Sequence, residues 1–149
     1  AEAVELARSV NDHKREVDFL LNLGESYMAT NNLEKAFMSY QQALKGTQRL
    51  QRMVDTGYLL GRMGVILAEL DQTEEAIHYH EQAVAMAQKH DLPDLEGEQL
   101  VMLAMAYLDE NQFDKARSYG ETAVQIYTTA GLNENAAKAQ QLLAQIAVE

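Results

Sequence analysis

Apolar residues recur along the chain at two periods, a short one of three to four residues and a long one of forty. The short period gives residues 17–28 one broad apolar face, as expected of an amphipathic helix. Short polar side chains at Asn31 and Asn32 then break the pattern, and a second helical pattern begins near Leu33. The sequence therefore predicts two helices joined by a short turn.

This helix pair is repeated at intervals of forty residues. We expect complete units at 13–52, 53–92 and 93–132. Residues 1–12 then match the tail of a preceding unit, and residues 133–149 match the first or capping helix of a fourth. The chain is accordingly expected to be one domain that forms a piece of a longer array. The boundary near Gln51 to Val54 is not marked by a helix-breaking residue.

Small residues occupy fixed positions in each unit. Glycine or alanine stands within the first helix, and two alanines seven residues apart stand on the second. A glycine in a helix costs about 1 kcal/mol relative to alanine, so its use predicts close contact between the helices. The recurring positions, with the leucines and aromatic residues that flank them, are Leu20, Gly24, Tyr27, Ala36, Ala43, Leu60, Gly64, Ala76, Ala83, Leu100, Ala104, Tyr107, Ala116 and Ala123.

These positions resemble the signature of the tetratricopeptide repeat, with leucine in place of the usual tryptophan. In the second unit His80 replaces the second aromatic residue, and in the third Gly120 does; the late proline of the signature is absent throughout. The unit of 40 residues exceeds the common one of about 34. It is similar to the extended repeats of kinesin light chain, Pins-type polarity adaptors and bacterial peptide-sensing regulators. The resemblance implies an all-α, right-handed superhelical solenoid of antiparallel helix pairs.

The resemblance also implies binding, because in this family the first helices line a concave groove that receives a peptide or a helix. Lysine and asparagine, which grip a carboxylate in one version of the groove, are missing from the corresponding positions. We therefore expect a mostly apolar groove and, as its guest, an apolar or amphipathic helix. The expected groove residues are Leu21, Glu25, Met28, Tyr58, Arg62, Val65, Val101, Met105 and Leu108.

Several readings of these positions stay open at the level of sequence. Val101, Met105 and Leu108 belong to an almost wholly apolar helix, so burial between neighbouring units is the alternative to contact with a partner. The expected role is a scaffold or adaptor for protein–protein interaction. A regulatory peptide sensor within a larger signalling protein is one alternative. Self-association through the repeat ends, which lack polar caps, is another.

Composition and charge narrow the classes of partner. The formal net charge of −11 argues against nonspecific binding of nucleic acid, which requires a basic surface. The charge is uneven, because residues 13–52 carry six basic and four acidic side chains, whereas residues 53–132 carry four and fourteen. The chain has no cysteine, no apolar run of the ~20 residues that span a bilayer and no signal peptide. We therefore expect no membrane insertion and a cytoplasmic location.

Candidate catalytic and metal-binding residues are few. His78 and His80 are two residues apart on a predicted helix and point in different directions, so they do not form a metal pair. The sequence also lacks a phosphate-binding glycine loop and the common hydrolase motifs. We expect no enzymatic activity, no cofactor and no metal site.

Overall fold

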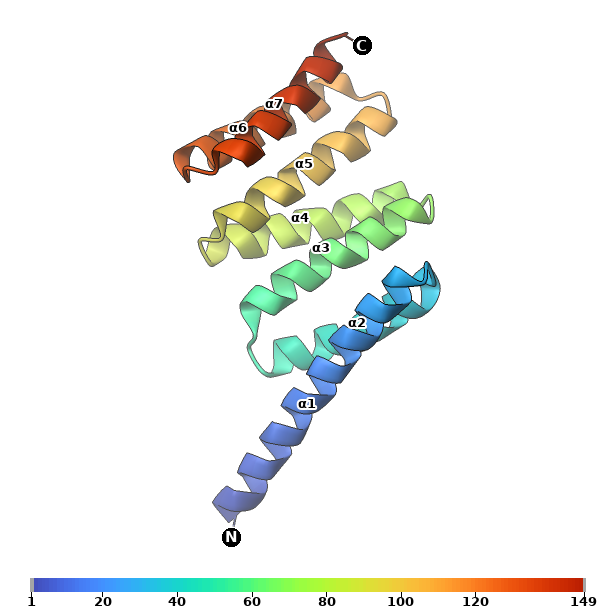
Figure 1. The fold of residues 1–149 in the computed structure, drawn as a ribbon, viewed down its shortest axis with the longest axis vertical. Helices are drawn as coiled ribbons and strands as arrows, with labels where there is room; N and C mark the ends of the chain where they lie inside the picture. Colours follow the sequence, from blue (N-terminus) through green and yellow to red (C-terminus); the bar gives the residue numbers. More distant parts are fainter. Residues whose placement is uncertain (1, 149) are drawn as a thin grey trace.

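The computed structural model describes residues 2–148, so Ala1 and Glu149 of the expected end units lie outside the described chain. Its regular elements are seven helices connected by short turns (Figure 1). They are α1 (Glu2–Ala29), α2 (Leu33–Arg49), α3 (Met53–Glu69), α4 (Thr73–Lys89), α5 (Pro93–Asp109), α6 (Phe113–Thr129) and α7 (Asn133–Val148). The expected all-α, right-handed solenoid of antiparallel helix pairs is confirmed.

The turns between the helices share one backbone geometry. In each turn one residue takes the left-handed conformation, and the amide that follows it donates a hydrogen bond back to the last turn of the preceding helix. At the first turn, for example, the Asn32 amide donates to the Tyr27 carbonyl over 2.8 Å. The residues with positive φ are Asn31, Gln51, Asp71, Asp91, Asn111 and Gly131. All of these residues except Gln51 are asparagine, aspartate or glycine, which take a positive φ more readily than other residues. The turn at Gln51 therefore lacked a clear signal in the sequence.

The boundaries of most expected units coincide with helix starts. Helices α3, α5 and α7 begin at Met53, Pro93 and Asn133, the first residues of the second, third and fourth expected units. Proline suits the first position of α5, because the amide it lacks would have no partner within the helix.

The expected boundary after residue 12 has no turn. Helix α1 is a single helix of 28 residues, and its first third extends beyond the end of α2 (Figure 1). The stretch from Val10 to Glu16 contains neither glycine nor proline, so a continuous helix satisfies its backbone groups locally. Val4 and Leu6 on this extension are 55% and 67% exposed.

Small residues bring the two helices of each pair together. The repeated alanines of the second helices, such as Ala36 and Ala43, are fully buried. In the first unit the ring of Tyr40 lies where a side chain on Gly24 would begin, and in the second the His80 ring lies over Gly64. The first helices α1, α3, α5 and α7 thus form one side of the solenoid, and α2, α4 and α6 form the other (Figure 1).

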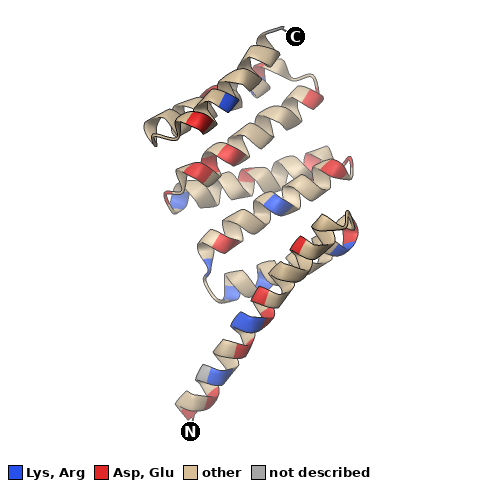
Figure 2. Ribbon diagram, viewed as in Figure 1, with Lys and Arg blue, Asp and Glu red and all other residues tan. Residues whose placement is uncertain are grey.

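Charged side chains are distributed along the solenoid as the sequence indicates (Figure 2). Basic residues are most frequent on α1 and α2, although α1 also carries acidic ones, whereas the later helices carry mostly acidic residues. Within residues 2–148, no helix is long and apolar enough to cross a membrane.

Candidate functional site

The side of the solenoid formed by α1, α3, α5 and α7, here called the first-helix face, carries the predicted groove residues. Met105 and Tyr58 are the most exposed of the large apolar side chains among them, at 46% and 40%. Glu25 and Arg62 are also exposed. The half-buried members are Leu21, Met28, Val65, Val101 and Leu108. Half-buried apolar side chains beside charged ones leave this face both accessible and partly apolar.

A pocket of about 220 Å³ lies between the first two units and brings four predicted residues together. Within it, Glu25 accepts a hydrogen bond from the Tyr40 hydroxyl over 2.8 Å and pairs with Arg62 over 3.3 Å. The carboxylate therefore joins α1, α2 and α3 at the floor of the pocket. Its lining residues are Leu21, Glu25, Tyr40, Asp55, Tyr58, Leu59 and Arg62.

A second, smaller pocket of about 130 Å³ lies between α5 and α7. Of the predicted groove residues only Val101 lines it. Glu98, Tyr127 and Asn135 line it without having been predicted; Glu98 could have been found, because it stands three residues before Val101 on the same helix face. The full lining is Glu98, Val101, Met102, Tyr127, Asn135, Lys138 and Ala139.

The other predicted residues line neither of these pockets. Val65 and Met105 stand at the repeat position that Glu25 holds in the first unit, and Leu108 stands at the position of Met28. They extend the apolar character of the first-helix face along α1, α3 and α5 without forming a cavity.

Acidic side chains set the electrostatics of the first-helix face. The Tyr58 hydroxyl donates a hydrogen bond to Asp94 over 2.8 Å, and burial together with this bond and charge raises the pKa of Tyr58 to about 12. Loss of water raises the pKa of Glu98; Arg62 opposes the rise and Asp94 adds to it. Unlike these groups, Asp55 is paired with Arg52, which also binds Asp18.

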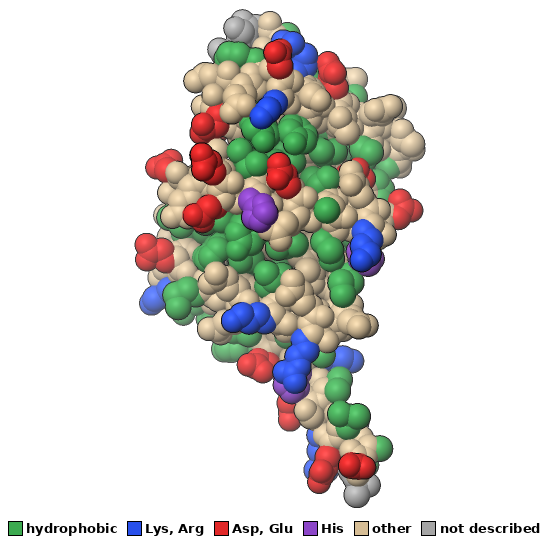
Figure 3. Space-filling view, turned by 180° about the vertical axis from the view of Figure 1, so that it is seen from behind, with side chains coloured by type: hydrophobic (Ala, Val, Ile, Leu, Met, Phe, Trp, Pro, Cys, Tyr) green, Lys and Arg blue, Asp and Glu red, His purple; other side chains and the backbone are tan. Residues whose placement is uncertain are grey.

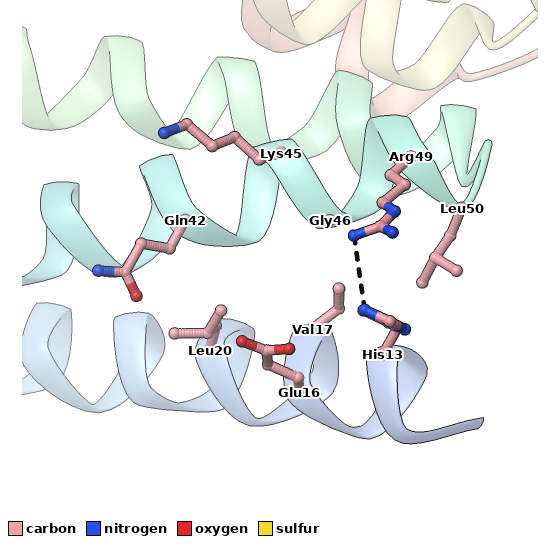
Figure 4. Close-up of a pocket in the computed structure, with 9 residues that line it drawn as sticks. All are labelled: His13, Glu16, Val17, Leu20, Gln42, Lys45, Gly46, Arg49 and Leu50. Atoms are coloured by element: carbon pink, nitrogen blue, oxygen red, sulfur yellow. Dashed lines mark hydrogen bonds between the residues drawn. The ribbon is translucent and has the colours of Figure 1, made fainter. Parts of the chain in front are cut away.

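A pocket of about 300 Å³ lies at the end of the first unit, between α1 and α2 (Figure 4). The guanidinium of Arg49 lies 3.5 Å from Nε2 of His13, and His13 contacts the Ser9 carbonyl through its other ring nitrogen. Val17 and Leu20 supply apolar surface to this pocket. No predicted groove residue lines this pocket.

The opposite side of the solenoid, formed by α2, α4 and α6, also exposes apolar groups (Figure 3). Met38 is 59% exposed there and borders, with Tyr79, a pocket of about 480 Å³ between α2 and α4. The remaining lining is largely amide side chains, with Lys45 as its one charged group. The pocket between α2 and α4 offers an apolar surface, with one charged side chain to orient a guest.

The structure separates the two central histidines. His80 is 2% exposed, and its Nδ1 hydrogen-bonds to the side-chain oxygen of Gln99 over 2.7 Å, whereas His78 lies on the surface. Burial lowers the pKa of His80, so the ring is neutral inside the solenoid. Within residues 2–148, no three potential ligand side chains come together around a metal position.

Known sequence families and structures place the chain among repeat proteins. Sequence models of the tetratricopeptide repeat match residues 16–89 and 100–130. No curated protein sequence matches the chain. Many solved structures do match it, and the three that follow are examples with the same fold at low sequence identity.

Aspartyl phosphate phosphatase F from Bacillus subtilis superimposes with a TM-score of 0.83 at 20% identity, over 89% of this chain and 35% of that one. A signal transduction ATPase with a tetratricopeptide repeat sensor from Pyrococcus horikoshii gives 0.81 at 20% identity, over 95% and 22%. The Rap conjugation regulator of plasmid pLS20, in complex with the Phr* peptide, gives 0.79 at 17% identity, over 94% and 39%. The chain thus spans less than half the length of each of these proteins.

Proposed function

The chain belongs to the tetratricopeptide repeat family, and from this premise we propose that it is an interaction scaffold which binds a segment of a partner protein. The proposed binding surface is the first-helix face, acting as a mostly apolar groove. Its guest is a peptide or an amphipathic helix, with apolar side chains against Val101, Met102 and Met105.

One observation carries this proposal. The first-helix face combines accessible apolar side chains with two pockets that open between successive first helices. A guest that crosses the repeats can place side chains in both pockets, while the charged groups around them fix its register. Methionine adds to this, because its flexible side chain fits guests of different shape.

The structural neighbours support a peptide as the guest. The Rap regulator with the Phr* peptide has the same fold, and its bound ligand is a peptide. The chain is proposed to bind without catalysing a reaction, since its pockets between repeats contain acids, a few cations and apolar groups rather than a nucleophile beside a base. A cytoplasmic location is part of the proposal.

The test uses peptides selected from a displayed random library on the wild-type protein. Their affinities are then compared for two methionine variants, Met105→Glu on the first-helix face and Met38→Glu on the opposite side. Both methionines are largely exposed, so each variant is expected to fold, which circular dichroism checks. We expect Met105→Glu to weaken binding by at least about tenfold and Met38→Glu by less than about twofold. The reverse pattern would move the binding surface to α2 and α4.

A regulatory sensor is the second candidate, and the similarity to a repeat sensor from Pyrococcus horikoshii favours it. In a sensor, the bound peptide draws the repeats closer together and changes the shape of the solenoid. Small-angle scattering with a selected peptide separates the two functions: a smaller radius of gyration on binding indicates a sensor, and an unchanged one indicates a rigid scaffold. Self-association would instead appear as a molecular mass that grows with protein concentration.

A further inference from the structure

Within residues 2–148, two carboxylates on α5, Asp94 and Glu98, form no ion pair on the first-helix face. They stand one helical turn apart, where like charges repel. By contrast, Glu25 and Asp55 on the same face are paired with arginines. Asp94 and Glu98 therefore contribute negative charge to this face that no ion pair of the described chain balances.

The surroundings of the two carboxylates confirm that their charge is incompletely balanced. Asp94 accepts a single neutral hydrogen bond, from Tyr58. For Glu98, loss of water and the nearby Asp94 both disfavour the ionised form, and only Arg62 opposes them. Arg62 is itself paired with Glu25. An additional cation at this point would remove a repulsion that the isolated protein retains.

An apolar pocket adjoins the carboxylates. Glu98 forms one wall of the pocket between α5 and α7, Val101, Met102 and Ala139 supply its apolar surface, and Lys138 lies on α7. With Arg62 and its partner Glu25 included, the site has three carboxylates, Glu25, Asp94 and Glu98, against two cations, Arg62 and Lys138. It therefore favours a cationic guest with an apolar neighbour over an acidic or wholly apolar one.

We propose that the segment bound on the first-helix face is a basic and apolar peptide: a lysine or arginine lies against Asp94 and Glu98, and an adjacent apolar side chain enters the pocket between α5 and α7. This inference rests on the proposed function and specifies the chemistry of its guest. The net charge of −11 acts in the same direction, because it increases the rate of encounter with cationic segments.

A charge-specific selection tests the inference. Random displayed peptides are selected on the wild-type protein and on Asp94→Lys/Glu98→Lys. We expect wild-type selections to be enriched in lysine or arginine beside leucine, methionine or phenylalanine, and the charge-reversed variant to select acidic residues instead.

A thermodynamic cycle then assigns the contact to these two carboxylates. The best wild-type peptide and its counterpart with the basic residue replaced by glutamine are titrated against wild type and Asp94→Asn/Glu98→Gln. We expect the neutral variant to lose about tenfold in affinity for the basic peptide and to bind both peptides almost equally. Glu74→Gln/Glu75→Gln on α4 removes the same charge from exposed positions on the opposite side and should leave the affinity within about twofold.

The outcomes separate this inference from the proposed function. If peptides bind and Met105→Glu weakens them, but they lack a basic residue or show no coupling to Asp94 and Glu98, the inference fails and the scaffold function stands. If no peptide binds, or if Met105→Glu has no effect on those that do, both fail.

Discussion

The contact between the first and second units and that between the second and third use the same repeat positions but different chemistry. At the first, Tyr40 packs on Gly24, and Leu59 of the next unit joins the same apolar cluster. At the second, His80 packs on Gly64, and Gln99 of the next unit hydrogen-bonds to its ring. An aromatic–leucine contact has thus been replaced by a buried polar pair.

The comparison shows that the repeat fixes where side chains meet, but not how they interact. The Tyr40 side chain is 1% exposed, and its hydroxyl donates to Glu25 on the surface, so an apolar neighbour such as Leu59 leaves nothing unsatisfied. The His80 ring is enclosed and needs Gln99, which is itself 3% exposed. Each residue of this pair therefore depends on the other.

The contact between the third and fourth expected units uses a third arrangement of side chains. Gly120 stands at the position of Tyr40 and His80, and a side chain there would meet Leu143 from α7. The first helix of that unit carries Ala104 instead of glycine, and Ala104 is fully buried. The volume removed from the second helix is thus filled from the following unit.

The largest expected effect comes from Tyr40, which is almost fully buried. Tyr40→Ala should lower the free energy of unfolding by about 3–5 kcal/mol, because the cavity lies between two units. Tyr40→Phe should cost less than about 1.5 kcal/mol, since it removes only the bond to Glu25. Urea denaturation followed by circular dichroism measures both; similar losses for the two variants would mean that the hydroxyl, and not the ring, stabilises this contact.

A smaller effect is expected where the polar pair is broken on one side. Gln99→Leu places leucine where the first contact has Leu59 and leaves the His80 ring without its partner, at a cost of about 1–3 kcal/mol. Adding His80→Tyr reproduces the first contact and should recover most of that loss in the same denaturation experiment. A double variant that is no more stable than Gln99→Leu would contradict the equivalence of the two contacts.

The pH dependence of stability should also distinguish the two contacts. Burial lowers the pKa of His80, so below the ordinary value of about 6.5 the unfolded chain binds a proton that the folded chain resists. The contribution of His80 should therefore lower the stability as the pH decreases from about 6.5 to about 5, and should be absent at higher pH. His80→Tyr/Gln99→Leu should show a weaker decrease, and since it keeps every carboxylate, the difference between the two titrations isolates His80.

The smallest effect is expected at Phe19, which holds the repeat position of Leu59 and Gln99 but is 64% exposed. Phe19→Gln should change the free energy of unfolding by less than about 0.5 kcal/mol, whereas Leu59→Ala should cost about 2–4 kcal/mol. A decrease above about 1 kcal/mol in the free energy of unfolding of Phe19→Gln would show that Phe19 is buried in solution. If a second copy of the chain buries it, the molecular mass in solution would be that of a dimer.

Much of the fold could be predicted because its determinants are local. The apolar period predicted a helix that begins near Leu33, as the structure has it. The turn at Gln51 was poorly marked because glutamine rarely takes a positive φ. The continuity of α1 was missed because repeat register alone does not reveal whether a turn interrupts a helix.

The candidate site was predictable only for residues on the first helices. Projection of the repeats onto one helix face brought Leu21, Glu25, Tyr58 and Arg62 together, and the structure places all four in one pocket. Tyr127 was missed, because it lies on α6, a second helix, and only the first helices were projected onto the groove.

The sequence by itself determined the helix pairs, their period and the family, because these depend on residues three, four and forty positions apart along one pattern. Only the tertiary structure decided that His80 pairs with Gln99 and that Glu98 faces a pocket shared with α7. These groups lie on different helices and meet only once the helices stack. The burial of these groups and the balance of charge around them depend on how the helices pack, and a local sequence pattern does not predict that packing.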